Sequence, residues 1–218
     1  MQPTLDTWTS VFLLAVAMGL YLFIMLISSR NNKNFPIAFL ILSFSVILFQ
    51  YVLYWTRYET VFPYLMMLPP LCYYATGPLL YLYFLNLYRK KVRFNYLLHF
   101  FVSILALVSN VVLWLKYMGL ENIEIPFMFL IRGHWLITIH MCFYTFLIIR
   151  LIRDQQTLDT EFDKVRYKWS KVLVSLYSIF ILAYISYYVL INFSFFNNQW
   201  DYMISITMSI SIYAIGYF

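Results

Sequence analysis

The sequence predicts an all-α polytopic membrane protein, a bundle of seven transmembrane helices with its N-terminus outside the cell and its C-terminus in the cytoplasm. Hydrophobic residues make up 63% of the 218 residues, charged residues only 11%, and the mean hydropathy is +0.75. Seven apolar stretches are long enough to cross a bilayer, which takes about 20 residues each. Basic residues gather in alternate connections, as expected of the side that faces the cytoplasm.

The composition excludes most soluble classes of protein. A water-soluble domain carries about 25% charged residues, so lipid must surround most of this chain. The net charge of +6 would suggest nucleic acid as a partner for a soluble protein. Here we assign the surplus to membrane topology and expect no direct nucleic-acid binding by the chain. The lipid bilayer is the expected partner, and residues 1–218 form one transmembrane domain.

Each expected span is a run of mostly apolar residues between polar connections. The seven spans, in order, are 8–28, 37–56, 63–88, 96–116, 134–152, 169–191 and 201–218. The connections are short, so helices that follow one another in the sequence are expected to be neighbours in space.

The orientation follows from the basic residues. With the N-terminus outside, the inner connections hold Arg30, Lys33, Arg89, Lys90, Lys91, Arg93, Arg150, Arg153, Lys164, Arg166, Lys168 and Lys171. The outer side holds only Arg57, Lys116 and Arg132. The opposite orientation would place the larger group outside, against the usual excess of basic residues on the inner side.

Small residues recur four apart in the first and last spans, as Ala15-x-x-x-Gly19 and Ser205-x-x-x-Ser209. Such spacing lets helices approach closely in lipid. Packing within the chain is the expected use, and a homodimer contact is the alternative.

The third span carries Pro69-Pro70 and Gly77-Pro78. A proline inside a helix removes a backbone donor and clashes with the preceding turn, so this span is expected to be kinked twice. The kinks could serve static packing, or they could form a hinge that moves when a ligand binds outside.

The longest inner connection, residues 154–168, predicts a short helix on the inner membrane surface that runs into the sixth span. Leu158, Phe162, Val165 and Trp169 recur at helical spacing and share one face. A docking surface for a partner is the alternative interpretation.

Polar side chains within the spans share one expected depth, about 9 Å below the outer boundary at about 1.5 Å per residue. The set comprises Gln50, Asn110, His140, Tyr184 and Thr207, with Arg132 at the outer edge. Polar groups in hydrocarbon need partners or a wet cavity. The layer is therefore either a cluster of hydrogen bonds between helices or a pocket for an unknown small-molecule ligand.

Catalytic and cofactor chemistry find no support in the sequence. His99 and His140 are expected near opposite faces of the membrane, so they cannot share a metal ion. The last span has no lysine for retinal, and no phosphate-binding glycine loop or HExxH motif occurs. We expect no enzymatic activity, no cofactor and no metal.

Several segments resemble the N-terminal membrane region of Bacteroidetes AraC-type helix-turn-helix transcriptional regulators. They are Ser-Arg-Asn-Asn-Lys-Asn at 29–34, Tyr-Ala-Thr-Gly-Pro-Leu-Leu-Tyr-Leu-Tyr at 74–83, Leu-Leu-His-Phe at 97–100 and Ser-Ile-Tyr-Ala-Ile-Gly-Tyr-Phe at 211–218. In that family a bundle of about seven spans precedes a cytoplasmic DNA-binding domain. The resemblance covers essentially the whole chain and supplies no ligand residues.

The resemblance implies a signal-input module in the bacterial inner (plasma) membrane that senses an external or membrane cue. No helix-turn-helix follows within the chain, so we expect a fragment of a longer regulator or one that has lost its output domain. A small membrane transporter and an accessory membrane subunit are the alternatives.

Overall fold

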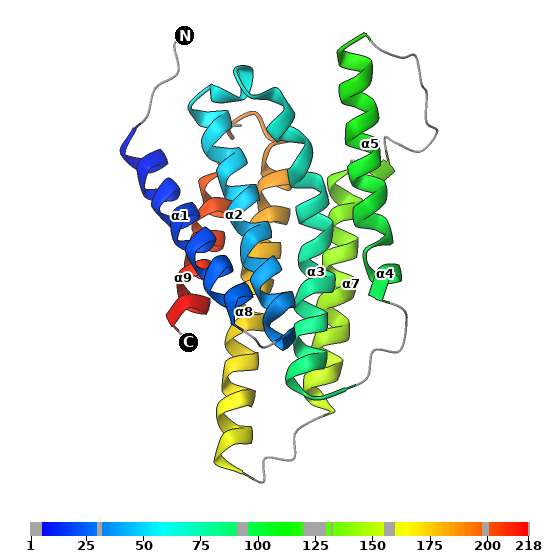
Figure 1. The fold of residues 1–218 in the computed structure, drawn as a ribbon. Helices are drawn as coiled ribbons and strands as arrows, with labels where there is room; N and C mark the ends of the chain where they lie inside the picture. Colours follow the sequence, from blue (N-terminus) through cyan, green and yellow to red (C-terminus); the bar gives the residue numbers. More distant parts are fainter. Residues whose placement is uncertain are drawn as a thin grey trace.

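The computed structural model describes residues 6–29, 32–90, 96–119, 130–131, 133–154, 160–197 and 201–217. Within these ranges the protein is all-α, with eight α-helices and three short 3₁₀ helices (Figure 1). The all-α class predicted from the sequence is confirmed.

Helices α1 (Thr7–Ser28) and α2 (Phe35–Trp55) form the first antiparallel pair. Asp6 caps α1, because its carboxylate accepts a hydrogen bond from the Thr9 amide at 2.7 Å. The 3₁₀ helix η1 (Asn32–Asn34) leads into α2. Gly19 of α1 lies directly against Ser45 of α2, where an added Cβ would meet the serine hydroxyl. The small-residue motif of the first span therefore packs within the chain.

Helix α3 (Leu68–Leu87) lies in the middle of the bundle and contacts α2, α5 and α7. The 3₁₀ helices η2 (Tyr58–Thr60) and η3 (Pro63–Met67) connect it to α2. Pro69 and Pro70 occupy the first turn of α3, where a missing amide donor costs little. The expected kink at this pair is therefore replaced by a helix start, and Pro78 is the proline inside the described helix.

The fourth expected span is divided into α4 (Tyr96–His99) and α5 (Phe101–Tyr117), with Phe100 between them. Helix α5 packs on α3 at the side of the bundle (Figure 1). Helix α7 (His134–Arg153) packs between α3 and α8.

Helix α8 (Glu161–Leu190) is continuous over 30 residues, so the expected surface helix and the sixth span are one element. Thr160 caps it by accepting a hydrogen bond from the Asp163 amide. The first turns of α8 project beyond the neighbouring helices (Figure 1). Leu158 of the predicted apolar face lies outside the described residues. Helix α9 (Tyr202–Tyr217) closes the bundle against α1, α2 and α8.

The longer helices alternate in direction along the chain (Figure 1). Helix α1 starts and α9 ends at opposite ends of the bundle. We call the end where α1 and α9 finish and α8 begins the basic end, because it gathers Lys33, Arg89, Lys90, Arg150, Arg153, Lys164, Arg166, Lys168 and Lys171. The other end is called the opposite end; Arg57 and Lys116 lie there.

The buried core is made mostly of Leu, Ile, Phe and Tyr, with α2 and α3 at its centre. The outer faces are also apolar. Leu14 of α1, Phe146 of α7 and Leu182 of α8 are each more than 60% exposed. Such faces are unfavourable in water and are expected in lipid.

Among the residues that the structure describes, four helices, α1, α2, α7 and α8, are long and apolar enough to cross a membrane. Helices α5 and α9 are apolar but shorter. Helix α3 is mostly buried inside the bundle. It contains tyrosines, prolines and a threonine, so its sequence is less apolar than that of a lipid-facing helix.

Candidate functional site

A cluster of aromatic side chains with polar groups lies inside the bundle near the opposite end. We define this tyrosine cluster as Tyr51, Tyr73, Tyr184, Tyr188 and His134. Tyr51 of α2 and Tyr73 of α3 share a hydrogen bond between their hydroxyls at 2.9 Å. The rings of Tyr73 and Tyr184 lie 5.2 Å apart, which brings α8 into the same cluster.

His134 joins the tyrosine cluster from the first residue of α7. Its Nδ1 lies 3.1 Å from the Tyr184 hydroxyl. Its ring stacks on Tyr188 with 3.5 Å between centroids. The cluster therefore connects α2, α3, α7 and α8 through groups that can exchange hydrogen bonds without an ionised side chain.

A buried carboxylate lies next to this cluster, in the connection just before α9. Asp201 is 3% exposed and accepts a hydrogen bond from Nε1 of Trp55 at 2.7 Å. Burial raises the pKa of Asp201 to about 6, while the hydrogen bond from Trp55 opposes that rise. The Trp55 ring also stacks on Tyr51, so Trp55 contacts both the carboxylate of Asp201 and the tyrosine cluster.

Helix α8 is linked to α3, and to Tyr88 directly after it, by three hydrogen bonds along its length. The hydroxyls of Tyr177 and Thr76 lie 2.9 Å apart, and so do those of Ser170 and Tyr88. Near the basic end, the Trp169 indole donates to the Tyr83 hydroxyl at 2.9 Å. We call these three bonds the α3–α8 ladder. In hydrocarbon such bonds hold helices together and fix their relative rotation.

Two of the residues predicted for the polar layer lie on α7 and α8. Tyr184 belongs to the tyrosine cluster. His140 packs against the rings of Tyr74 and Tyr144, with centroids 5.2 and 4.9 Å away. Its Nδ1 is buried and has no hydrogen-bond partner among the described residues.

The other predicted residues lie on separate elements. Asn110 of α5 donates to the Met67 carbonyl at 3.4 Å and lines a cavity of about 570 Å³ with Glu59. Gln50 is half-buried on α2. Thr207 donates to the Ile204 carbonyl of its own helix. Arg132 lies outside the described residues. That Gln50, Asn110 and His140 line one pocket stays a prediction.

Gly77 lets two helices meet closely at the middle of α3. A Cβ at this position would lie 3.0 Å from Cβ of Tyr144 on α7. Gly77 and Pro78 therefore combine close packing with a proline inside the helix, and both are buried. A hinge at this pair stays a prediction.

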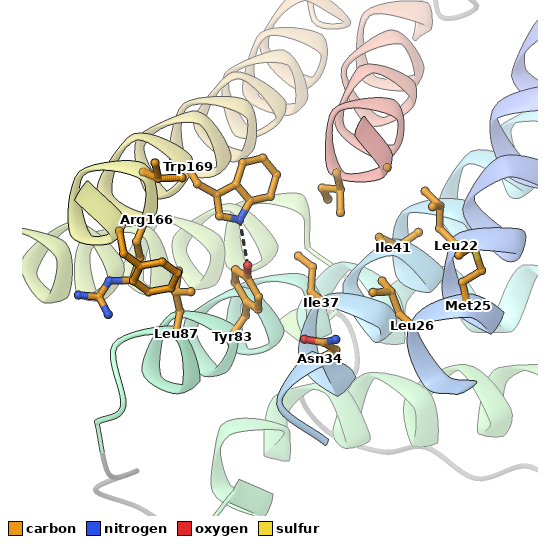
Figure 2. A pocket seen from close by; sticks show the side chains of 14 residues that line it. Leu22, Met25, Leu26, Asn34, Ile37, Ile41, Tyr83, Leu87, Arg166 and Trp169 are labelled. Atoms are coloured by element: carbon orange, nitrogen blue, oxygen red, sulfur yellow. Dashed lines mark hydrogen bonds between the residues drawn. The ribbon is translucent and has the colours of Figure 1, made fainter. Parts of the chain in front are cut away.

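A second feature is the basic-end cavity, which occupies about 470 Å³ where α1, α2, α3, α8 and α9 meet (Figure 2). Its lining is mostly apolar and includes Leu22, Ile37 and Leu87. Arg166 and Trp169 of α8 supply polar groups to the lining, together with Tyr83 of α3, which is hydrogen-bonded to Trp169 (Figure 2). This cavity could not be predicted from the sequence, because its lining comes from five separate helices.

The described residues contain no group of His, Cys, Asp and Glu side chains placed to hold a metal ion. No protein-family model, curated protein or solved structure matches the chain. The four long apolar helices and the apolar outer faces define the class to which the chain belongs, a multi-pass helical membrane protein.

Proposed function

We propose that the chain is the signal-input module of an AraC-type transcriptional regulator in the bacterial inner membrane, and that it has no enzymatic activity. The main support for the proposal is the path of α8 from one end of the bundle to the other. This single helix links the tyrosine cluster near one end of the bundle to the projecting basic segment at the other. Its 30 residues correspond to a length of about 45 Å.

The module would cross the membrane seven times, with the basic end in the cytoplasm. The alternating direction of the longer helices supports an odd number of crossings. The basic residues gathered at the end of α3, the end of α7 and the start of α8 support the orientation, because cytoplasmic connections are rich in Lys and Arg.

Signalling would proceed by a shift between two packings of α8 against α3. A cue that binds or perturbs the tyrosine cluster would change the hydrogen bond between Tyr184 and His134. Rotation of α8 would then break or exchange bonds of the α3–α8 ladder and move the projecting segment. A ligand can shift such an equilibrium only by binding one packing better than the other.

The resemblance to the regulators in the segments at 29–34, 74–83, 97–100 and 211–218 supports the assignment to this family. The segment at 74–83 contains Thr76, Gly77, Pro78 and Tyr83, two of which take part in the α3–α8 ladder. The resemblance and the proposed coupling element therefore fall on the same part of α3.

A chimera tests the function. An AraC-type DNA-binding domain is fused after Phe218, and its promoter drives a reporter gene in a bacterial host. Tyr177→Phe removes one bond of the ladder while keeping the ring, so we expect reporter output to change several-fold at equal protein level. Tyr21→Phe is the matched control, because Tyr21 is 58% exposed on the outer face of α1.

Equal output from the parent chimera, Tyr177→Phe and Tyr21→Phe would contradict coupling through α8. Uptake of a solute by vesicles that contain the unfused chain, without any change in reporter output, would favour the transporter alternative.

A further inference from the structure

We propose that the basic-end cavity binds an anionic phospholipid, with an acyl chain among its apolar side chains and the headgroup beside Arg166. The proposal requires a membrane protein of several spans and does not depend on the signalling role.

The walls of the cavity suit a hydrocarbon chain. Leu22, Met25 and Leu26 of α1 lie beside Ile37 and Ile41 of α2 in its lining (Figure 2). The volume of about 470 Å³ falls in the range of small-molecule sites, about 300–1,000 Å³. In a multi-pass membrane protein, phospholipids surround the ends of the helices, so an apolar cavity between these ends is exposed to acyl chains.

The α8 wall presents an apolar stripe with one cation. Phe162, Val165, Arg166 and Trp169 follow helical spacing and all line the cavity. Phe162 and Val165 lie on the same face of α8 as Trp169, which packs against the core. Their side chains are nevertheless 69% and 66% exposed. An acyl chain would cover these two side chains, which the protein itself leaves open.

The charge near the cavity selects an anionic headgroup. Arg166 pairs with Asp163 and lies over the ring of Tyr88, 5.0 Å from its centroid. These contacts hold the guanidinium at the cavity wall. Lys33 immediately precedes Asn34 of η1, which lines the cavity. Basic pockets between helices at a cation-rich membrane face bind anionic headgroups through such side chains.

The experiment measures phospholipid binding to the purified full chain in detergent by native mass spectrometry. Phosphatidylglycerol and phosphatidylcholine with identical acyl chains are the two probes. We expect the chain to prefer phosphatidylglycerol, and Arg166→Gln to weaken its binding about tenfold, the effect of about 1.4 kcal/mol. Arg153→Gln is the matched control, because Arg153 ends α7 at the same end, is exposed and does not line the cavity.

A second variant tests the acyl-chain part of the site. Val165→Trp places a larger side chain at the cavity wall without changing charge, and Val165 is exposed enough to accept it. We expect weaker binding of both phospholipids to this variant. If Arg166→Gln fails to fold, the preference of the parent chain for phosphatidylglycerol tests the headgroup part, and Val165→Trp tests the acyl-chain part.

A third measurement locates the bound chain. Phosphatidylglycerol with brominated acyl chains should quench tryptophan fluorescence in the parent protein more than in Trp169→Phe. Equal binding of the two phospholipids, or equal losses in Arg166→Gln and Arg153→Gln, would overturn the proposal. Unchanged binding by Val165→Trp, or equal quenching with and without Trp169, would also overturn it.

Discussion

At the scale of single residues, the tyrosine cluster shows how hydroxyl groups can be placed inside an apolar bundle. Each hydroxyl sits at the rim of a large ring, so the ring fills the core while the oxygen finds a partner. The hydroxyls of Tyr51 and Tyr73 are hydrogen-bonded to each other, and the Tyr184 hydroxyl is hydrogen-bonded to Nδ1 of His134. The arrangement keeps polar groups in the core without burying an ionised side chain.

The bond between Tyr51 and Tyr73 gives the first prediction. Tyr51→Phe and Tyr73→Phe should each lower the free energy of unfolding by about 0.6–1 kcal/mol, because each leaves a buried hydroxyl without its partner. The double variant should cost less than the sum of the two single variants, since both remove the same bond. Denaturant titration of the purified protein measures all three.

Tyr21→Phe is the control for this cycle, because the Tyr21 side chain is exposed on α1. It should leave the free energy of unfolding unchanged. Strictly additive losses in the double variant would show that the two hydroxyls do not interact.

The pKa of Asp201 gives the second prediction. Its folded-state value of about 6 lies above the ordinary value of 3.8, so the folded protein binds this proton more tightly than the unfolded chain does. The contribution of Asp201 to stability is therefore fully present below about pH 4 and is lost as the pH rises through about 6. Asp201→Asn should remove this dependence.

Thermal unfolding at a series of pH values measures the difference between the two proteins. As the pH rises through this range, the melting temperature of the parent should fall relative to that of Asp201→Asn. The expected fall is about 2–4 °C for each 1 kcal/mol of stability lost. The comparison cancels the titration of His99, His134 and His140, which both proteins share. Parallel pH profiles would contradict the buried position of Asp201.

Among the residues predicted for the polar layer, Tyr184 is the one that lies in the tyrosine cluster. It was named from its position in the span. Tyr51 and Tyr73 were missed, because with 21 tyrosines in the chain no single one stands out. Their pairing depends on the rotation of α2 and α3 about their axes, which the weak amphipathicity of membrane helices does not define.

At the scale of elements, α3 and α8 determine how the bundle could transmit a change. Helix α3 lies between its neighbours and is interrupted in its backbone hydrogen bonding by Pro78. Helix α8 is longer than a membrane crossing requires and extends past the basic end. The α3–α8 ladder joins the two, with Thr76 directly before Gly77 and Pro78.

The contact at Gly77 gives the third prediction. Gly77→Ala should destabilise the protein relative to Gly216→Ala by about 1 kcal/mol, a typical cost of overpacking. At Gly77 the new Cβ meets the Cβ and ring of Tyr144 at 3.0–3.1 Å. At Gly216 it meets the flexible end of Leu22, which can move aside.

Both variants replace a helical glycine by alanine, so the difference in their free energies of unfolding reports the packing cost against α7 together with the restriction on the residue before Pro78. If the two variants are equally stable, α3 and α7 are not packed as closely as the structure describes.

The positions of the helices could be predicted from apolar runs, but several boundaries could not. Pro69-Pro70 looked like a kink in a span that began at residue 63, whereas the chain forms a 3₁₀ helix to Met67 and starts α3 at Leu68. The connection at 154–168 was expected to form a short surface helix that runs into the sixth span, and its described part does continue into that span. Nothing between Glu161 and Trp169 breaks a helix, so the segment continues directly into α8.

At the scale of the whole molecule, the bundle has the charge and surface of a membrane protein. Its exposed faces are apolar along α1, α7 and α8, and its basic residues lie mainly at one end. Composition and the spacing of apolar runs predicted the class, because both depend on the surrounding lipid. The basic-end cavity was not predictable, because five helices must be placed in space before it exists.

The central claim is that the chain crosses the membrane an odd number of times, with the basic end in the cytoplasm. Single-cysteine labelling tests it most directly, in a background with Cys72→Ala and Cys142→Ala. Trp8→Cys at the start of α1 and Tyr217→Cys at the end of α9 change exposed side chains. In intact cells a membrane-impermeant maleimide should label Trp8→Cys alone, and lysis should expose Tyr217→Cys. Labelling of both in intact cells, or of Tyr217→Cys alone, would contradict the account.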